Sequence, residues 1–263
     1  MKYLMLFRII SAMTAITVLT AASLPQTGPM PQQKPDREQA QPSAEPPTPI
    51  EKPAVPETQP TAGEMQGPPK PPLTIAAESE EEHKACLTQL TAIGATFKDI
   101  PRIDDSNGCG IDKPIALAEP LPGIQMKPQG TMRCETALAL AHWMKESVIP
   151  SAATLKDNGR IVTVNQASTY ICRLRNNATT GKISEHARGN AVDIAGFTFE
   201  NGKTIGIEPR REDPTLTGAF QRTASASACL YFSTVLDPDS DAAHETHFHL
   251  DVLKRNSGFR YCH

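Results

Sequence analysis

Ser184-Glu-His-Ala-Arg-Gly-Asn-Ala-Val-Asp193 and His247-Phe-His249 are the two stretches that decide how this chain folds. The first runs into a mostly apolar segment, Ala191 to Phe197, which is typical of a buried strand. Asp193 is the one acid in that segment, and a buried carboxylate is costly unless it is paired or bound to a metal. The sequence therefore predicts a strand that needs a partner for Asp193.

The histidines of both stretches can provide that partnership through a metal ion. Zn²⁺ in a hydrolase takes three protein ligands and keeps a fourth position for water. In an extended segment alternate side chains share a face, so His247 and His249 point the same way while Phe248 packs behind them. One of these histidines can then bind the metal, and the other can handle a proton.

A single histidine or aspartate more often satisfies local backbone groups than binds a metal. In this chain, however, four of the seven histidines lie at 186 and between 244 and 249. Gly189, between His186 and Asp193, also leaves room for the backbone to approach closely. The joint pattern predicts a zinc site.

These residues also carry a family resemblance. Ser-x-His-x-x-Gly-x-Ala-x-Asp at 184 to 193, followed by His-x-x-His-x-His at 244 to 249, resembles the superfamily of lysostaphin, the D-alanyl-D-alanine metallopeptidases and the hedgehog fold. The second motif is most similar to that of the penicillin-insensitive murein endopeptidases. Together with Tyr170-Ile-Cys-Arg173 and Arg260-Tyr-Cys262, it makes residues 84 to 263 resemble the C-terminal domain of bacterial extensin-like proteins.

The resemblance implies roles for individual residues. His186, Asp193 and His249 would be the zinc ligands, and His247 would be the catalytic base. Arg173 would lie on a strand beside the site, where its guanidinium would orient substrate or stabilise a developing oxyanion. The alternative for Arg173 is a surface charge on that strand.

One branch of the superfamily uses a glutamate three residues before its last ligand as general base, and Thr246 occupies that position here. Glu245 is one residue away and would face away from His249 in a regular strand, which favours His247 as the base. Ser184, His244 and Glu245 are candidates for residues around the ligands. The alternative for His244 is a loop residue without a role in the site.

The N-terminal part of the chain predicts export. Lys2 and Arg8 precede an apolar stretch from Ile9 to about Leu24, which is typical of a secretory signal and short for a membrane span. We expect residues 1–24 to be a signal peptide or an uncleaved anchor, and the protein to reach the periplasm or cell envelope, tethered to the inner membrane if the anchor stays. Residues 25–73 are expected to be a disordered linker, because residues 25–72 hold 15 of the 24 prolines and no aromatic residue.

Residues 74–263 are then one domain, and all the cysteines lie in it. An even number of cysteines in an exported chain favours disulfides. Their connectivity stays open from sequence, although a Cys229–Cys262 pair would tie the last helix to the C-terminal end. The six candidates are Cys86, Cys109, Cys134, Cys172, Cys229 and Cys262.

The apolar patterns of this domain predict an α+β fold. We expect helices followed by a mainly antiparallel sheet with flanking helices, a zinc site on the concave face of the sheet, and stabilising disulfides. Asp213-Pro214 supplies a cap and first turn for the third helix. The expected helices are 80–91, 134–147 and 214–234, and the expected strands are 161–165, 168–174, 191–198, 204–207 and 247–253.

A zinc hydrolase outside the cytoplasmic membrane has bacterial cell wall within reach, and the resemblance implies peptidoglycan stem peptides as substrate. The motif favours an endopeptidase that cleaves crosslinks. The alternatives are a D-alanyl-D-alanine carboxypeptidase, which requires a cation for the terminal carboxylate that the sequence does not locate, and a non-catalytic wall-binding protein with a retained metal site. The net charge of −3 gives no support for nucleic-acid binding, and the sequence names no protein partner.

Overall fold

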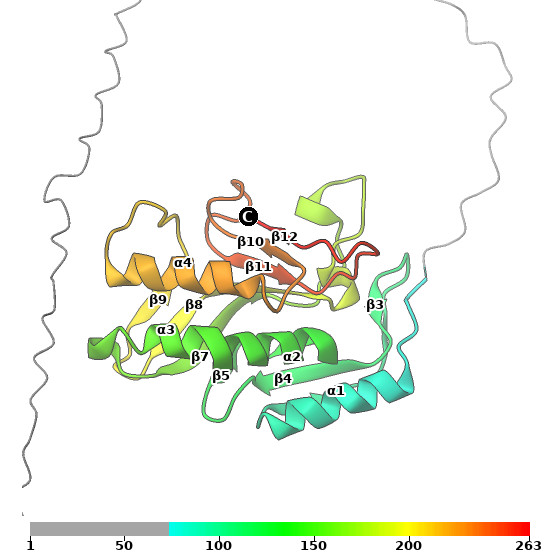
Figure 1. Cartoon of the computed structure of the whole chain (residues 1–263). Coiled ribbons are helices and arrows are strands. Elements are labelled where there is room, and N and C mark those ends of the chain that lie inside the picture. Colours follow the sequence, from blue (N-terminus) through cyan, green and yellow to red (C-terminus); the bar gives the residue numbers. More distant parts are fainter. Residues whose placement is uncertain (1–73) are drawn as a thin grey trace, which may run out of the picture. The chain divides into compact units, whose positions relative to one another are not determined.

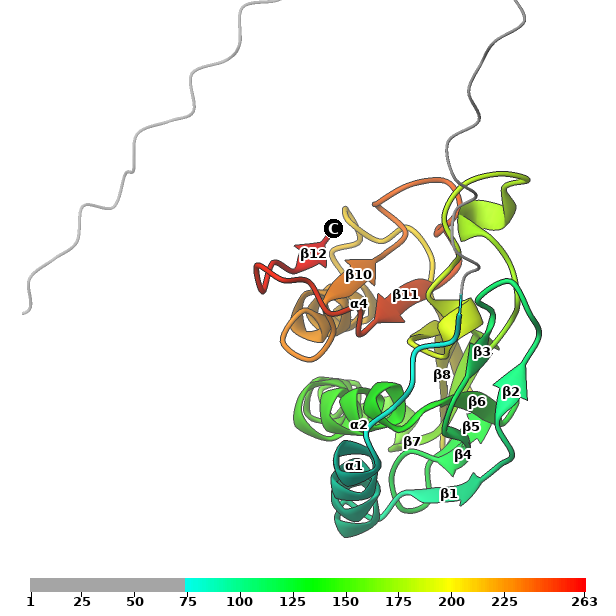
Figure 2. The ribbon, with the colours of Figure 1, turned by 90° about the vertical axis from the view of Figure 1, so that its right-hand side faces the viewer.

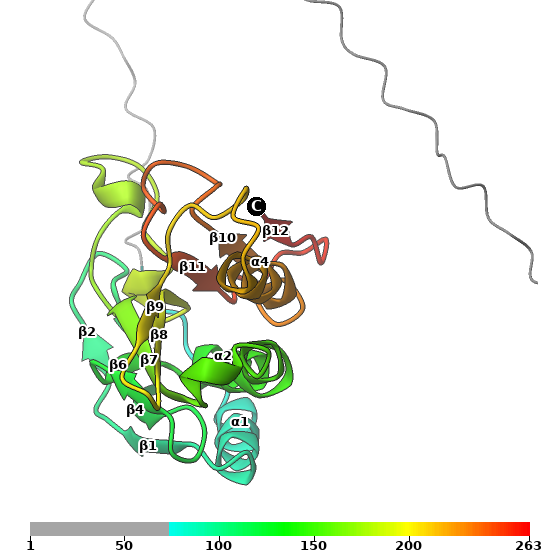
Figure 3. The same cartoon turned by 90° about the vertical axis from the view of Figure 1, so that its left-hand side faces the viewer.

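The computed structural model describes residues 74–263, so the expected signal or anchor and the proline-rich linker lie outside the described residues. Helices form one layer of this domain and strands form the other (Figure 1), as the two side views also show (Figure 2 and Figure 3). The helices are α1 (Glu80–Ala92), α2 (Cys134–Trp143), α3 (Ile149–Ala152) and α4 (Leu216–Ala228). No helix within this part of the chain is long and apolar enough to cross a membrane.

The main sheet has seven strands in the order β12-β10-β11-β8-β7-β5, with β9 paired to β8. Its β5–β7 and β10–β12 pairs are parallel, and the other pairs are antiparallel. The strands are β5 (Gln125–Lys127), β7 (Ile161–Ser168), β8 (Ala191–Phe199), β9 (Thr204–Gly206), β10 (Thr234–Leu236), β11 (Phe248–Asp251) and β12 (Tyr261–Cys262). The predicted α+β class with a mainly antiparallel sheet is confirmed.

Two small antiparallel sheets are formed by strands between residues 96 and 133. One has the order β1-β4-β6, and the other pairs β2 with β3. Their strands are β1 (Thr96–Asp99), β2 (Ile103–Asp104), β3 (Gly110–Ile111), β4 (Pro114–Glu119) and β6 (Gly130–Arg133). The sequence patterns did not predict these strands.

The core lies between the helices and the main sheet. Trp143 on α2 is fully buried, and its ring centroid lies 6.1 Å from Phe197 on β8, 6.3 Å from Phe232 and 6.4 Å from Phe248 on β11. The Trp143 indole N–H donates to the carbonyl of Ala224 on α4 at 3.0 Å, so its one polar group is satisfied. Phe248 thus packs into the core behind the two histidines that flank it, as expected.

The first two predicted helices are close to those observed, and the third is shorter than predicted. The second continues from α2 through a π-helical turn, Met144–Val148, into α3. The third starts at Leu216 with Thr215 as its N-cap, because the Thr215 side chain accepts from the amide of Gly218. Asp213 lies two residues before this cap and its side chain accepts from the Thr215 amide, so Asp213 is not the cap itself.

The predicted strand 168–174 is wrong beyond its first residue. β7 ends at Ser168, and residues 169–184 form a loop closed by a bridge between Leu174 and Ile183. The aromatic and β-branched residues of 168–174 are typical of strands, but here they serve tertiary contacts. The Tyr170 hydroxyl donates to Asp105 at 2.6 Å, and Cys172 is bonded to Cys109, so the segment is drawn off the edge of the sheet.

All six cysteines are paired, and the three disulfides tie distant elements. Cys86–Cys134 joins α1 to the start of α2, and Cys109–Cys172 joins the segment after β2 to the 169–184 loop. Cys229–Cys262 joins the end of α4 to β12, which is the pair considered from the sequence. The domain is therefore stabilised by disulfides, as predicted.

Candidate metal centre

The register between β8 and β11 places Asp193 directly opposite His249. Side chains alternate along a strand, so Val192, Ile194, Phe248 and Leu250 enter the core while Asp193 and His249 leave the sheet on the other face. Residues directly opposite in an antiparallel pair have Cβ atoms about 5 Å apart, close enough for their side chains to meet over one point. The alternation read from sequence thus brings these two side chains together.

His186 reaches the same point from a short 3₁₀ turn, His186–Arg188, that ends at Gly189. Gly189 has a left-handed φ of 68°, and a Cβ there would lie 2.4 Å from the Ile111 side chain. Its carbonyl accepts from the Arg133 amide at 3.0 Å and from the Thr136 hydroxyl at 2.9 Å. The glycine therefore allows the close backbone approach expected from the sequence, and it fixes the turn that carries His186.

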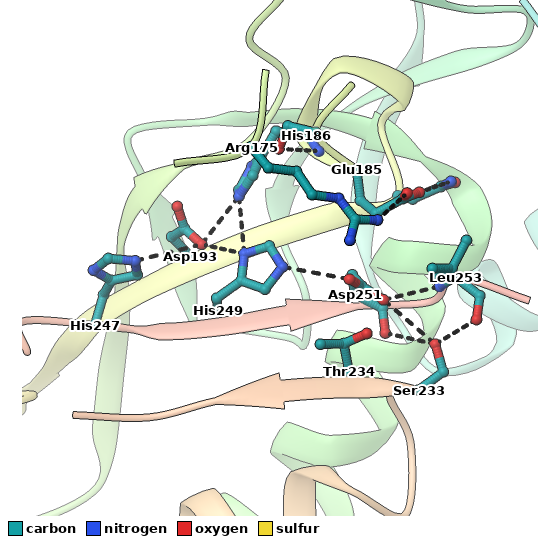
Figure 4. Close-up of polar contacts among 12 residues, drawn as sticks. Arg175, Glu185, His186, Asp193, Ser233, Thr234, His247, His249, Asp251 and Leu253 are labelled. Atoms are coloured by element: carbon teal, nitrogen blue, oxygen red, sulfur yellow. Dashed lines mark hydrogen bonds and ion pairs between the residues drawn. The ribbon is translucent and has the colours of Figure 1, made fainter. Parts of the chain in front are cut away.

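Three ligand-type atoms from these residues converge in a triangle (Figure 4). His186 Nε2 lies 3.1 Å from Asp193 Oδ1 and 3.1 Å from His249 Nδ1, and His249 Nδ1 lies 3.0 Å from Asp193 Oδ1. Ligand atoms about 2.0–2.1 Å from a tetrahedral zinc ion lie about 3.3 Å from one another. The separations within the triangle are thus close to those that one zinc ion would impose.

The outer hydrogen bonds of the two rings assign their inner nitrogens. His186 Nδ1 lies 2.7 Å from the Thr169 carbonyl, so this nitrogen carries the hydrogen and Nε2 presents a lone pair. His249 Nε2 faces Asp251 Oδ2 at 3.4 Å, which leaves the lone pair of its Nδ1 inside the triangle. Two nitrogen lone pairs and a carboxylate then face each other, and only a proton or a cation between them relieves their repulsion.

The charges of the centre follow from this convergence. Burial raises the pKa of Asp193, but hydrogen bonds with His186 and His249 outweigh burial and hold the pKa of this carboxyl well below its usual range. Burial lowers the pKa of His249, but its hydrogen bonds with Asp193 and Asp251 bring that pKa to about 9. Without a metal, the triangle thus retains a proton on His249 at neutral pH.

His247 stands at the edge of the triangle. It lies just before β11, and its Nε2 is 3.8 Å from Asp193 Oδ1, with 17% of its side chain exposed. Burial lowers the pKa of His247 below its usual value despite the attraction of Asp193. The ring is therefore neutral near pH 7 and partly open to solvent, as a proton acceptor must be.

Of the three residues expected around the ligands, two lie near the triangle and one does not. His244 is buried, its Nδ1 lies 2.7 Å from Asp241 Oδ1, and its ring centroid is 5.3 Å from that of His247. The Ser184 hydroxyl accepts from the His186 amide at 3.4 Å. Glu245 is exposed and does not line the cleft at the triangle, so the structure does not bring it to the site.

Arg173 reaches the site, although from the 169–184 loop and not from the strand that the resemblance implied. Its Nη2 lies 3.9 Å from Asp193 Oδ2, the carboxylate oxygen that faces away from the histidines. The Arg173 carbonyl accepts from the Ser184 amide at 3.1 Å, and the neighbouring Cys172 is held by its disulfide. These two anchors place the guanidinium beside the triangle without a strand.

Sequence reasoning missed several residues of the site. Asp251 orients His249, and its other oxygen accepts from the Leu253 amide at 3.0 Å. The signal was available, because Asp251 lies two residues after His249 and must share its face in a strand. The sequence also did not indicate that Glu185 is buried. It is buried between Arg175 at 3.3 Å and Asn190 at 2.9 Å, and so braces the loop against the turn of His186.

A cleft of about 480 Å³ opens over the triangle. Its lining includes His186, Asp193, His247 and His249 at the base, and the 169–184 loop on one wall. The cleft is also lined by Arg173, Arg175, Thr234, Asp251, Arg255, Phe259 and Tyr261.

Comparison with known proteins gives one family. No curated protein matches the chain, and no solved structure matches it. The model of the family described as "Extensin-like protein C-terminus" matches residues 84–263, which include every residue of the triangle and all three disulfides. The chain therefore belongs to the family of extensin-like protein C-terminal domains.

Proposed function

We propose that this domain is a zinc-dependent peptidoglycan hydrolase that cleaves amide bonds of stem peptides, with crosslinks as its main target. The observation that carries the proposal is the triangle of His186 Nε2, Asp193 Oδ1 and His249 Nδ1, whose members face one another as acceptors. Such a set is stable with a metal cation or a proton at its centre and unfavourable without either.

The donor set favours zinc among the common metals. Two neutral imidazoles and one carboxylate are a typical ligand set of catalytic zinc sites, which leave a fourth position for water or substrate. Hard cations such as Ca²⁺ and Mg²⁺ prefer oxygen ligands throughout. When bound here, zinc would supply a Lewis acid that polarises a substrate carbonyl and lowers the pKa of a water molecule.

His247 would handle the proton of the reaction. Water adds its oxygen to the scissile carbonyl carbon, and Nε2 of His247 accepts the proton that this water loses. As the carbon–nitrogen bond breaks, the same proton passes to the leaving amine. The lowered pKa of His247 suits this role, because the ring must be neutral to accept the proton.

Arg173 would stabilise the negative charge that develops on the carbonyl oxygen. Its guanidinium is beside the triangle but only loosely paired with Asp193, at 3.9 Å, so N–H groups remain for the substrate. A fixed cation aimed at a developing oxyanion lowers the barrier because it need not reorganise during the reaction. His244 would position His247 through its ring contact and its bond to Asp241.

The substrate class rests on the family resemblance and on the expected export of the chain. The cell wall is the polymer that an exported bacterial hydrolase meets, and the His-x-x-His-x-His motif is similar to that of murein endopeptidases. The open cleft over the triangle suits an extended peptide better than a small enclosed ligand.

The test is digestion of purified peptidoglycan by the disulfide-intact protein, with and without chelator, followed by mass spectrometry of the muropeptides. We expect crosslinked dimers to become monomers, chelator to stop the reaction, and zinc to restore it. His249→Ala should lose both zinc and turnover, whereas His247→Ala should keep zinc and lose turnover. His142→Ala is the matched control, because His142 on α2 is only half-buried and lies outside the cleft.

Two outcomes would replace the proposed endopeptidase with another function. Loss of a terminal alanine from pentapeptides, with crosslinks intact, would identify a carboxypeptidase. Unchanged muropeptides in the presence of bound zinc, together with sedimentation on cell wall, would identify a non-catalytic wall-binding protein. Turnover by a metal-free His249→Ala variant would refute the metal-dependent mechanism altogether.

A further inference from the structure

We infer that Arg255 forms a carboxylate-binding subsite in the cleft and selects substrates with a carboxylate about two residues from the scissile amide. The inference rests on the proposed function for the position of the scissile bond. It concerns a cation that lies outside the recognised motifs, in the segment after β11.

Charge pairing sets Arg255 apart from the other arginines of the cleft. The lining holds Arg173, Arg175 and Arg255 together with three acids, Glu185, Asp193 and Asp251. Arg175 pairs with Glu185 at 3.3 Å, and Arg173 faces Asp193 at 3.9 Å. The third acid, Asp251, faces His249 at 3.4 Å, and no carboxylate within residues 74–263 forms an ion pair with Arg255.

The Arg255 guanidinium is nevertheless held in place. Its Nη1 donates to the Ser233 carbonyl at 2.7 Å, and its Nη2 donates to the Thr234 hydroxyl at 2.7 Å. A guanidinium has five N–H groups in a planar fork, so the remaining donors can bind a carboxylate. A cation that is oriented by neutral groups and lacks an acid is prepared for an anionic ligand.

The register of β10 and β11 gives the distance of this cation from the triangle. Leu236 lies opposite His249, and Thr234 lies opposite Asp251, two residues further along. At about 3.3 Å per residue, Thr234 is displaced by about 7 Å along the strand from the ligand His249. An extended peptide covers this length in about two residues.

Two aromatic side chains border the same part of the cleft. Phe259 and Tyr261 both line it, with 58% and 42% of their surfaces exposed. They offer apolar surface beside the cation, which would pack against the aliphatic part of a bound peptide. This wall therefore recognises a short peptide segment with an acidic end or an acidic side chain.

The test measures binding of a synthetic stem pentapeptide that ends in D-alanyl-D-alanine. It is compared with a C-terminally amidated copy and with a copy whose side-chain carboxylates are amidated. The protein is the zinc-loaded full chain with His247→Ala, so that no peptide is consumed, and calorimetry gives the Kd. Adding Arg255→Gln should weaken binding of the unmodified peptide by about tenfold, the effect of losing one charge-assisted contact.

Amidation of the recognised carboxylate should cause a similar loss in the parent protein and no further loss with Arg255→Gln. The amidated copy that shows this behaviour identifies the source, terminal or side-chain. Arg255→Lys should retain part of the affinity because it keeps the charge. Lys254→Gln is the matched control, since Lys254 is the adjacent cation, its side chain is 76% exposed, and it lies outside the cleft.

The inference fails if Arg255→Gln weakens all three peptides equally, if it changes none of them, or if the parent protein binds none. These outcomes are separable from failure of the proposed function. If the chain binds peptides through Arg255 but never cleaves peptidoglycan, the subsite is supported and the hydrolase proposal is refuted. If it cleaves peptidoglycan but binds peptides without Arg255, only the hydrolase proposal is supported.

Discussion

At the scale of single residues, each histidine of the triangle is oriented by an outer hydrogen-bond partner. The Thr169 carbonyl sets the tautomer of His186, and the Asp251 carboxylate sets that of His249. Such outer partners fix ring orientation and raise the basicity of the inner nitrogen. The metal affinity of the triangle therefore depends on residues that would not themselves touch an ion.

Asp251→Asn tests this dependence. The amide keeps the shape of the side chain and an acceptor for the Leu253 amide, but it removes the negative charge that faces His249 Nε2. We expect zinc affinity to fall by about 10- to 100-fold, measured by competition with a chromogenic chelator. Asp239→Asn, which alters an acid paired with Arg211 away from the triangle, should leave zinc affinity unchanged. Equal affinities for both variants would count against the role of Asp251.

The metal-free protein should lose stability as the pH rises. Burial lowers the pKa of His249, but Asp193 and Asp251 bring it to about 9, above the ordinary value of 6.5. A group whose pKa is raised by folding stabilises the fold fully below its unfolded pKa, and that contribution disappears as pH rises through the folded pKa. Urea unfolding of the chelator-treated protein should therefore show a loss between pH 6.5 and about 9. A His249→Gln variant that keeps the same pH dependence would contradict this assignment.

At the scale of elements, the site is where a tight turn meets two paired strands. The pairing of β8 with β11 sets Asp193 opposite His249, and the turn before β8 places His186 next to both. The turn is held by Gly189, whose backbone conformation and close packing both exclude a side chain. Placement of the first ligand is thus a property of the turn and not of the histidine alone.

Gly189→Ala should therefore cost more than strain alone. A left-handed non-glycine residue costs about 1–2 kcal/mol, and a Cβ at 189 would also overlap the Ile111 side chain. Gly202→Ala is the matched control, because its φ is 83° and a Cβ there meets nothing within 4 Å. We expect the unfolding midpoint in denaturant to fall further for Gly189→Ala, with loss of zinc affinity in that variant only. Equal losses would mean that packing against Ile111 does not matter.

Sequence patterns predicted the elements whose signals are local. The strand of Asp193 followed from its mostly apolar run and that of His249 from alternation, and α1 and α2 followed from their apolar patterns. Five of the six strands between residues 96 and 133 have only two to four residues, so their period is too brief to recognise. Arg173 was expected on a strand because its segment is β-rich in composition, whereas a disulfide and the Tyr170 hydrogen bond make it a loop. Tertiary bonds of this kind leave no periodic trace in the sequence.

At the scale of the whole domain, two of the disulfides differ in their relation to the cleft. Cys86–Cys134 braces α1 against α2 on the helix side, while Cys109–Cys172 holds the loop that carries Arg173 and Arg175. No residue of α1 or α2 lines the cleft, whereas Arg173, the neighbour of Cys172, does. Both bonds should stabilise the fold, but only Cys109–Cys172 holds a loop that lines the cleft.

Replacing both cysteines of a pair by serine separates these roles. Removing Cys109–Cys172 or Cys86–Cys134 should each cost about 4 kcal/mol of unfolding free energy, since the bonds close loops of 63 and 48 residues. Only loss of Cys109–Cys172 should also weaken binding of stem peptides, measured by calorimetry at a temperature where both variants are folded. Equal peptide affinities in the two variants would show that the loop is positioned without its disulfide.

The position of the ligands on two neighbouring strands would make the survival of the folded protein depend on metal binding. Asp193 and His249 lie on neighbouring strands that are 56 residues apart in sequence, so an ion held by both would clamp the centre of the sheet. Bound ligand stabilises a fold in proportion to the logarithm of its concentration over its Kd. Copies that never acquire the ion would open more often and be degraded first. The abundance of the folded protein would then follow metal supply.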